Sequence, residues 1–375
     1  MNIGIVVPYF TPYVRGNEYG LAQGLTHLGH KITIITSTAR APREKAITDT
    51  VSHGDNIDFD VRYLPVLIDV GDNPIVSGIK DHIRGQDIVM LQEDYPLICH
   101  KAYSAAREYD IPVILSSERT YSPENIAKRY ALKLLDATTN RKLRDGADAL
   151  TAHCSAAKEF IIEELGVKRE ITVIHVGVDT DLFRPGRSGR KYLKKGDFRI
   201  LTVARLHRYK GLEYLVEAME TVSKEIPQAH LYILGKGEEE QNLKSLVNKL
   251  QLNDAVTFLT NTVPNYEIPK LYSECDIYIQ PSIVEPYGIA VVEAMACGKP
   301  VIGTKIGGMR DTVLDEETGF LVKPGDPAEL AGRITMLRDD ELRRELGARA
   351  RARVEKEFDW KYIASRYQEL IDVIT

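Results

Sequence analysis

The chain has 375 residues, a length that is long for a single core and favours two domains. Its net charge of −5 excludes the surplus of Lys and Arg that a general nucleic-acid-binding protein carries. The 4 cysteines are widely separated and form no CxxC pair. The sequence therefore supports neither a disulfide framework nor a cysteine metal site, and it fits a reducing compartment.

The beginning of the chain lacks the features of a secretory signal. Its first apolar run, at 3–7, is followed by Pro8 and Pro12 and has no basic region before it. Elsewhere no run reaches the roughly 18 apolar residues of a membrane-spanning helix. We therefore expect a cytoplasmic protein, and peripheral contact at the inner membrane face stays open.

Short apolar runs alternate with helical patterns through the first half of the chain. We expect an amphipathic helix at about 18–28, ended by Gly29, and strands at 3–7, 31–36, 87–91, 113–116, 149–152 and 171–175. These runs lack the polar alternation of a half-exposed strand. They favour a parallel sheet that is covered on both faces.

A basic, glycine-rich stretch at 184–196 lacks apolar periodicity, and we interpret it as an interdomain linker. A second alternating series follows it. Its expected strands lie at 200–204, 230–234, 256–259, 277–280 and 301–303, and its helices at about 212–226, 239–250 and 288–297. Two consecutive series of this kind predict an α/β protein with two doubly wound, Rossmann-like domains that face each other.

Two cations follow the first strand of the second series. Arg205 and Lys210 stand in the loop between that strand and a helix that begins near Gly211. Ligands of open α/β sheets bind at the carboxyl ends of strands, and two cations beside a helix N-terminus suit the separate oxygens of a diphosphate. The alternative is a pair of solvated surface cations.

The helix expected at 288–297 is almost entirely apolar and contains one charged residue, Glu293. A buried carboxylate needs hydrogen-bond donors, and ribose hydroxyls would supply them; a structural ion pair with a nearby Lys or Arg is the alternative. Glu285 lies in the loop before the helix. At Gly288 the backbone can approach a ligand closely, and amides at this helix start would face sugar hydroxyls or phosphate.

Two weaker signals lie elsewhere. The paired glycines Gly307 and Gly308 follow an expected strand and can turn backbone N–H groups toward an anion, with a plain turn as the alternative. His153 and His207 have no partners at metal-ligand spacing, so we expect no metal site.

Together these residues resemble glycosyltransferase family 4, a retaining family with the two-domain GT-B fold. The resemblance covers nearly the whole chain, and its most specific part is Glu285 and Glu293 within the run 281–300. It implies an acceptor-binding domain at 1–188 and a nucleotide-sugar donor domain at 189–358. It also implies a crossover helix at 359–375 that packs back on the first domain, with Trp360 as a packing residue.

The resemblance implies a role for each charged residue of the second domain. Arg205 and Lys210 would hold the donor diphosphate and stabilise charge on the leaving nucleotide. Glu285 would contact the transferred sugar, and Glu293 would bind the ribose. The cations would take the role that a metal plays elsewhere, so neither a metal nor a cofactor is expected beside the donor substrate.

The resemblance also implies roles for backbone groups. Amides around Tyr287, Gly288 and Ile289 would meet sugar hydroxyls and the distal phosphate, and Gly16, in the first loop of the chain, would pass close to the diphosphate. Such enzymes are thought to use front-face attack, in which a donor phosphate oxygen accepts the acceptor's proton. This would explain why no obvious pair of nucleophile and base stands out.

Two positions depart from the family's pattern. Arg15 stands where the family often has a second glycine; it would contact phosphate or an anionic acceptor, or point into solvent. Glu118 stands where the family commonly has an active-site histidine. It would contact a donor hydroxyl, orient an acceptor, or mark a shifted or lost activity.

The predicted function is transfer of a hexose-type sugar from a nucleotide diphosphate sugar to a sugar, lipid-linked or small-molecule acceptor. Two alternatives stay open: an epimerase or hydrolase of nucleotide sugars, with Glu118 as the candidate base, and a non-catalytic subunit that binds the nucleotide sugar. No nucleic-acid partner is expected. A basic helix at 124–144 would dock on an anionic membrane surface or form a solvated face.

Overall fold

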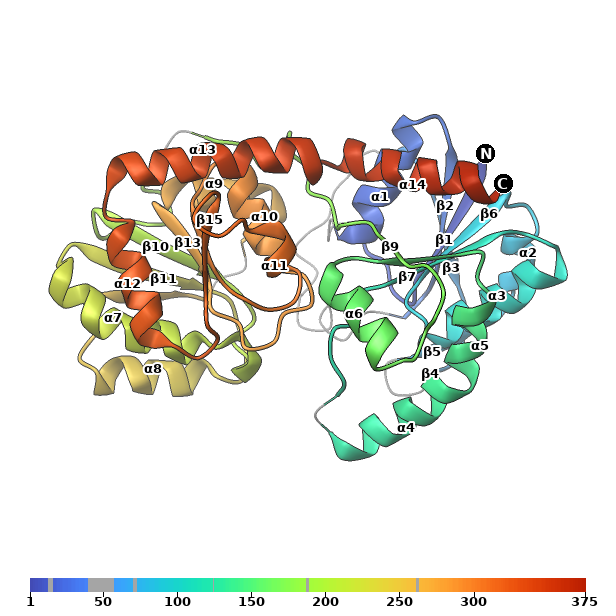
Figure 1. Ribbon diagram of the computed structural model, residues 1–375, viewed down its shortest axis with the longest axis horizontal. Coiled ribbons are helices and arrows are strands. Elements are labelled where there is room, and N and C mark those ends of the chain that lie inside the picture. The colour runs from blue at the N-terminus through green and yellow to red at the C-terminus, as the bar shows by residue number, and fades with distance from the viewer. Residues whose placement is uncertain (13–15, 40–56, 70–72, 124, 187–188, 261–262) are drawn as a thin grey trace. The chain divides into compact units, whose positions relative to one another are not determined.

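The structure is a computed structural model that describes residues 1–12, 16–39, 57–69, 73–123, 125–186, 189–260 and 263–375. These residues form two compact units (Figure 1). Unit 1 comprises Met1–Gly177 and Trp360–Thr375, and unit 2 comprises Val178–Asp359. Each unit contains a parallel sheet flanked by helices, so the predicted α/β fold with two doubly wound, Rossmann-like domains is confirmed.

A parallel sheet forms the centre of unit 1. Its strands pair in the order β3-β2-β1-β6-β7-β8-β9, with bounds Asn2–Val6 (β1), Lys31–Ser37 (β2), Asp60–Leu64 (β3), Ile88–Gln92 (β6), Val113–Ser117 (β7), Ala149–Ala152 (β8) and Thr172–Val173 (β9). A short antiparallel pair, Val66–Asp69 (β4) and Pro74–Val76 (β5), is separate from it. β6 and β7 are buried along their whole length, and each begins as an apolar run and ends in polar residues at its carboxyl end.

Helices cover both faces of the unit 1 sheet. They are Asn17–His27 (α1), Ile79–Ile83 (α2), Leu97–Glu108 (α3), Ile126–Ala137 (α4), Thr139–Gly146 (α5), Ser155–Glu163 (α6) and Trp360–Ile374 (α14). α1 packs on β2 and α14, whereas α3 packs on β1 and β6 and is flanked by α2 and α5 (Figure 1). The helix predicted from 124–144 is therefore two helices, α4 and α5, which meet at Thr138.

The sheet of unit 2 pairs in the order β12-β11-β10-β13-β14-β15. Its strands are Phe198–Val203 (β10), Ala229–Leu234 (β11), Val256–Leu259 (β12), Ile277–Gln280 (β13), Val301–Thr304 (β14) and Gly319–Val322 (β15). The order reverses between β10 and β13, so the connections of these neighbouring strands leave in opposite directions. The carboxyl ends of two such strands border the crevice in which doubly wound sheets bind ligands.

Two helical layers enclose the unit 2 sheet (Figure 1). One contains Leu212–Glu225 (α7), Glu240–Lys249 (α8) and Pro327–Met336 (α12); the other contains Ile268–Glu274 (α9), Ile289–Ala296 (α10), Met309–Thr312 (α11) and Asp340–Glu357 (α13). Short 3₁₀ turns lie at Arg208–Lys210 and Asn265–Glu267. α10 packs against α9, α11, α13 and two strands, which explains why it is apolar almost all round.

Residues 189–196 of the stretch that we interpreted as a linker pack on unit 2 instead. The carboxylate of Glu274 accepts hydrogen bonds from the backbone N–H groups of Lys191, Tyr192 and Leu193 at 2.8–2.9 Å, and Leu193 is buried. Bonds from consecutive N–H groups need no repeating side chains, so periodicity could not reveal them. The units divide after Gly177 and after Asp359, whereas the predicted boundaries lay after residues 188 and 358.

The last helix, α14, belongs to unit 1, whereas α13 before it belongs to unit 2. The indole of Trp360 lies against Gly177 and against Gly20 of α1, and Ala364 lies against Gly24. Three further side chains of α14 enter the core of unit 1: Ile363, Tyr367 and Ile371. Trp360 is therefore a packing residue, as expected. Within the part of the chain that the structure describes, no helix has the length and apolarity needed to cross a bilayer.

Gly20→Ala should weaken the packing of α14 on α1. A Cβ atom at Gly20 would lie 2.0 Å from Cε2 of Trp360, so the helices must move apart. Alanine favours a helix by about 1 kcal/mol, but overpacking costs about 1–3 kcal/mol, and we expect a net loss of roughly 1 kcal/mol in the free energy of urea unfolding. Gly85→Ala is the control, because nothing lies within 4 Å of its Cβ position. Equal stability of Gly20→Ala and the wild type would contradict this packing.

Candidate functional site

The loops that leave β10 and β13 meet at the carboxyl edge of the unit 2 sheet, where the strand order reverses. The carbonyl oxygen of Tyr209, in the loop after β10, accepts hydrogen bonds from the N–H groups of Ile283 (2.8 Å) and Val284 (3.1 Å), in the loop after β13. These bonds join the two loops, and residues that are distant in the sequence become neighbours.

Lys210 and Glu285 form an ion pair at this junction. Nζ and Oε2 are 2.7 Å apart, and the side chains are only 13% and 9% exposed. The same carboxylate oxygen accepts hydrogen bonds from Gln280 Nε2 (3.1 Å) and Ser282 Oγ (3.0 Å). Three donors thus fix Oε2, whereas Oε1 receives no hydrogen bond from the described residues and is left for a ligand.

The ring of Tyr209 lies beside both predicted cations. Arg205 Cζ is 5.9 Å and Lys210 Nζ is 5.2 Å from the ring centroid, within the reach of cation–π attraction. Arg205 is exposed, whereas Lys210 is largely buried beside Glu285. The alternative of two solvated surface cations is therefore wrong for Lys210, and Arg205 presents an exposed guanidinium beside the same ring.

Glu293 lies within α10 and contacts α9. Its Oε2 accepts a hydrogen bond from the Tyr272 hydroxyl at 2.9 Å. Burial raises the pKa of Glu293 to about 7, and the bond from Tyr272 offsets this only in part. No Lys or Arg of the described ranges pairs with this carboxylate, so the structure does not support the ion-pair alternative.

Two buried tyrosines link Glu293 to Glu285. The rings of Tyr272 and Tyr278 are in edge-to-face contact, with centroids 5.5 Å apart. The Tyr278 hydroxyl donates to Gln280 Oε1 at 2.6 Å, and Gln280 Nε2 donates in turn to Glu285. The two predicted carboxylates and the two predicted cations therefore lie in one connected region of unit 2.

Sequence reasoning missed Gln280 and Ser282, which hold Glu285 in place. Both are buried polar residues at the carboxyl end of β13, whose other residues are Ile277, Tyr278 and Ile279. A polar side chain that ends an apolar strand is the signal that would have found them, because ligand sites of open sheets form at that end.

Gly288 is the N-cap of α10 and has a φ of +93°. Glycine adopts this left-handed conformation without strain. The N–H groups at a helix start carry the positive end of the helix dipole, and that of Val291 already donates to the Gly288 carbonyl at 2.9 Å. Tyr287 is buried, whereas Ile289, the first residue of the helix, is exposed.

Gly307 and Gly308 support the loop of Glu285. A Cβ atom at Gly307 would lie 1.7 Å from the carbonyl oxygen of Glu285, and the Gly308 N–H donates to the carbonyl of Pro286 at 3.0 Å. The glycines therefore let two backbones pack directly together. The Gly308 N–H is used inside the protein, which favours the plain turn over an anion-binding pair.

The remaining predicted residues lie in unit 1 or outside the described residues. Gly16 and Glu118 lie in unit 1. Gly16 is the N-cap of α1, next to Asn17, whose Nδ2 is 3.5 Å from Gln92 Oε1 at the end of β6. Glu118 follows β7 and its side chain is exposed. Arg15 lies outside the described residues.

Sequence reasoning also missed Glu93, which follows β6 where the strand order of unit 1 reverses. Its φ of +73° is uncommon for a residue other than glycine. The buried carboxylate accepts hydrogen bonds from Ser117 Oγ (3.0 Å) and from the backbone N–H of Glu118. Burial, and then the negative charges of Glu118 and Asp94, raise the pKa of Glu93 to about 8. An unusual backbone and a perturbed pKa in one residue are typical of functional sites.

Among the described residues, no three His, Cys, Asp or Glu side chains are grouped so that they could hold a metal ion. His153 is buried, and this burial lowers its pKa to about 4. His207 pairs with Glu238 at 3.0 Å. His207 thus has a partner, whereas neither ring nitrogen of the buried His153 has a hydrogen-bond partner among the described residues.

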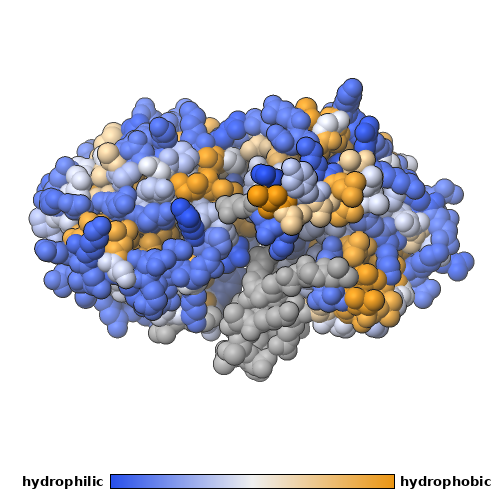
Figure 2. Space-filling model, turned by 90° about the horizontal axis from the view of Figure 1, so that it is seen from below, coloured by the Kyte–Doolittle hydropathy of each residue, from blue (hydrophilic) through white to orange (hydrophobic). Residues whose placement is uncertain are grey.

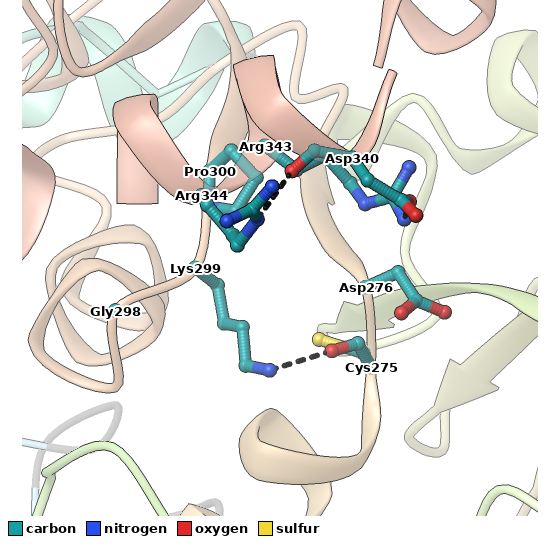
Figure 3. A pocket seen from close by; sticks show the side chains of 8 residues that line it. All are labelled: Cys275, Asp276, Gly298, Lys299, Pro300, Asp340, Arg343 and Arg344. Atoms are coloured by element: carbon teal, nitrogen blue, oxygen red, sulfur yellow. Dashed lines mark hydrogen bonds and ion pairs between the residues drawn. The ribbon is translucent and has the colours of Figure 1, made fainter. Parts of the chain in front are cut away.

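A cavity of about 490 Å³ lies at the opposite edge of the unit 2 sheet (Figure 3). Cys275 and Asp276 precede β13 and Lys299 precedes β14, so the cavity is at the amino ends of these strands. Lys299 Nζ donates to the Cys275 carbonyl at 2.7 Å, and Arg343 pairs with Asp340. These cations are engaged within the protein, and the cavity is separate from the site of Glu285.

Two family models match the chain. Glycosyl transferases group 1 matches residues 188–353, which include the loops of Lys210 and Glu285. Glycosyltransferase Family 4 matches residues 19–182, which include Glu93 and Glu118.

Curated relatives resemble part of the chain. A glycogen synthase from Mycobacterium tuberculosis is 29% identical over 72% of this chain and 65% of its own length. A D-inositol 3-phosphate glycosyltransferase from Paenarthrobacter aurescens is 31% identical over 60% of this chain and 57% of its own length. The chain thus spans less than two thirds of the length of these relatives.

Solved structures resemble the whole chain in fold. The Anabaena protein HepE in complex with UDP has a TM-score of 0.80 and 22% identity, with 100% of each chain covered. A sucrose-phosphate synthase from Thermosynechococcus elongatus has a TM-score of 0.78 and 22% identity, with 100% of this chain and 99% of that one covered. At this level of identity the likeness establishes the GT-B fold.

Glu93→Gln should change how stability depends on pH. The folded-state pKa of about 8 lies above the ordinary value of 4.5, so the native state binds the extra proton between these values and loses stability as pH rises through them. Glutamine does not ionise, so the unfolding free energy of the variant should fall less over this range, by about 1–3 kcal/mol.

Urea unfolding at about pH 5 and pH 8 measures this difference. Glu163→Gln, which changes an exposed carboxylate of α6, is the control and should follow the wild type. Parallel pH dependence of the Glu93 variant and the wild type would show that the pKa of this carboxyl is not raised.

Proposed function

Because the chain belongs to glycosyltransferase family 4, we propose that it transfers a hexose-type sugar from a nucleotide diphosphate sugar to an acceptor. The two family models cover both halves of the chain, including the segments that carry the candidate residues. The names of the relatives, which include a glycogen synthase and an inositol phosphate glycosyltransferase, agree with sugar transfer as the reaction class.

One observation carries the proposal: Lys210 and Glu285, 75 positions apart in the sequence, form an ion pair at the carboxyl edge of the unit 2 sheet. A nucleotide diphosphate sugar has two chemically different parts, charged phosphates and neutral hydroxyls. A cation attracts the first, and a fixed carboxylate oxygen accepts from the second. The pair therefore suits the bond between phosphate and sugar, which is the bond that the reaction breaks.

Arg205 and Lys210 would bind the diphosphate. The ammonium group of Lys210 has three N–H donors, of which Glu285 takes one, so the others remain for phosphate oxygens. The exposed guanidinium of Arg205 can bind a second phosphate through two parallel hydrogen bonds. With the N–H groups at the start of α10, these cations would stabilise the negative charge that builds on the leaving nucleotide.

Glu285 and Glu293 would bind hydroxyl groups. Because three donors hold Oε2 of Glu285, Oε1 would accept a hydrogen bond from the transferred sugar. Glu293 would accept from the ribose. Burial raises the pKa of Glu293 to about 7, and hydroxyl donors would stabilise its ionised form and lower that pKa again.

We assign the reaction to the retaining, front-face class. The acceptor hydroxyl oxygen forms a bond to C1 of the donor sugar on the face from which the diphosphate leaves. The bond from C1 to the phosphate oxygen breaks, and the electron pair stays on the nucleotide diphosphate. A donor phosphate oxygen accepts the acceptor's proton, so no side chain is required as a nucleophile.

The pair of Glu93 and Glu118 favours hydrolysis or epimerisation of the nucleotide sugar as a second candidate. A carboxyl whose pKa is raised to about 8 can exchange a proton near neutral pH, as a general acid or base must. This candidate yields a sugar product without an acceptor. A non-catalytic subunit would bind the nucleotide sugar without releasing nucleotide or sugar from it.

The acceptor in this proposal is a sugar, a lipid-linked sugar or a small molecule, and the compartment is the cytoplasm. All four cysteines are free and buried, which agrees with a reducing compartment.

Lys210→Met and Glu285→Gln should each lower kcat by about 10² or more, because each removes charge stabilisation at the breaking bond. Release of nucleotide from UDP-, GDP- and ADP-sugars measures turnover. Each single variant leaves a buried partner unpaired, which costs about 3–5 kcal/mol of stability, whereas the double variant Lys210→Met/Glu285→Gln should recover much of that stability.

The double variant separates catalysis from folding, since it should be stable and inactive. Lys224→Met, which changes an exposed cation of α7, is the matched control and should keep wild-type turnover. Wild-type kcat in a folded Lys210 or Glu285 variant would refute the proposed donor site.

Turnover should not depend on a divalent metal. Side-chain cations and the start of α10 would supply the positive charge, so kcat after dialysis against EDTA should stay within about twofold of the untreated value. Loss of activity that added Mg²⁺ or Mn²⁺ restores would overturn the metal-independent mechanism.

A further inference from the structure

The helix α4 differs from other long helices of the described chain, because none of its residues is buried. Its largest apolar side chains are strongly exposed: Ile126 by 63%, Tyr130 by 69% and Leu134 by 68%. Contiguous exposed apolar surface on a protein marks a site of interaction with a partner or a membrane. The function proposed above uses none of these residues.

These apolar side chains form one outward stripe. Residues four apart lie on the same side of a helix, so Ile126, Tyr130 and Leu134 are aligned. Leu132 and Asp136 are half-buried and mark the side that faces the body of unit 1, roughly opposite to the stripe. In Figure 1 α4 lies along the lower edge of unit 1, and Figure 2, seen from below, shows apolar residues gathered on that surface.

The exposed charges of α4 all have one sign. Lys128, Arg129 and Lys133 are exposed. At helical spacing Arg129 and Lys133 lie along one side of the apolar stripe, and Lys128 lies on the far side of the helix. The one acidic residue of the helix, Asp136, is bound by Arg119 at 2.9 Å and Arg144 at 3.3 Å. The surface of α4 is therefore apolar and positive, although the chain as a whole has a net charge of −5.

Polar contacts fix α4 in this orientation. At its start, the side chain of Asn125 accepts a hydrogen bond from the Lys128 N–H at 3.0 Å. At its end, Asp136 also accepts from Asn140 at 2.9 Å, and Arg144 in turn pairs with the buried Asp94. The helix is thus held through Asp136 and presents its apolar side to solvent.

We propose that α4 docks unit 1 on an anionic membrane surface, with Ile126, Tyr130 and Leu134 inserted among the lipid headgroups and the neighbouring cations Arg129 and Lys133 at the lipid phosphates. Long cationic side chains can extend their amines to the headgroups while their methylenes stay beside apolar residues. An apolar stripe with cations beside it is the pattern of helices that lie in the membrane interface. A second copy of this chain fits less well, because a symmetric contact through α4 would bring its cations together.

Vesicle binding tests this proposal without reference to catalysis. The purified full chain is sedimented with vesicles of phosphatidylcholine, or of phosphatidylcholine with about 30% phosphatidylglycerol. We expect binding to the anionic vesicles that weakens as salt is raised, and little binding to the neutral ones.

Two variants separate the apolar and the electrostatic contributions. Tyr130→Ser/Leu134→Ser should weaken binding to anionic vesicles by about tenfold or more, and Lys128→Gln/Arg129→Gln/Lys133→Gln should remove the preference for phosphatidylglycerol. Val373→Ser is the control, because Val373 is an 81% exposed apolar residue of α14, at the other side of unit 1 in Figure 1. Circular dichroism and Tm establish that each variant is folded, as expected for changes at exposed positions.

Three outcomes would overturn the proposal. One is the absence of wild-type binding to anionic vesicles, and another is undiminished binding by the folded serine variant. The third is a dimer in solution that the serine variant dissociates, which would assign α4 to contact between copies of the chain. None of these outcomes bears on Lys210 or Glu285. The proposed donor site and the proposed docking surface are therefore tested independently.

Discussion

The ion pair of Lys210 and Glu285 is the interaction on which the unit 2 site depends. Burying either charge alone costs several kcal/mol, and the cost is offset only when the partner and further donors are in place. The pairing requires the loops after β10 and β13 to be neighbours, which the reversal of strand order provides. It also requires the backbone of Gly307 to approach the carbonyl of Glu285 closely, so a structural glycine and two charged side chains form one constraint.

The two sheets repeat the same arrangement but place different charges at the carboxyl edge. In unit 2 the buried carboxylate, Glu285, faces a cation. In unit 1 the corresponding switch point holds Glu93, and its burial, followed by the negative charges of Glu118 and Asp94, raises the pKa of this carboxyl to about 8. One edge is therefore arranged to attract anions and hydroxyls, and the other to hold a proton near neutral pH. This difference supports the proposal that unit 2 binds the donor. In unit 1, Glu93 is the candidate group for proton exchange.

Sequence periodicity predicted the fold because buried parallel strands are rich in consecutive apolar residues. The positions of these apolar runs along the chain indicated where the strands lie, and their alternation with helical patterns indicated the α/β order. Glu293 was predicted because it is the one charge in an apolar helix, and Lys210 because it lies between the carboxyl end of a strand and a helix start. The role of Glu285 was implied by the resemblance to glycosyltransferase family 4. Sequence reasoning did not predict Gln280, because nothing in a sequence shows that one polar side chain donates to a carboxylate five positions later. The left-handed backbone of Glu93 was equally hidden, since residues other than glycine reach it only through tertiary contacts.

Helix α4 shows where the same reasoning has a physical limit. An apolar stripe at helical spacing indicates that one side of a helix is buried, and in a globular protein that side normally packs against the core. Here the direction is decided by Asp136, which turns inward because Arg119 and Arg144 bind it, and the apolar stripe is turned outward as a result. Those arginines lie outside α4, so the pattern within the helix cannot contain this information. A helix that is apolar toward solvent gains nothing from burial in the fold, and its sequence is therefore explained by a partner surface.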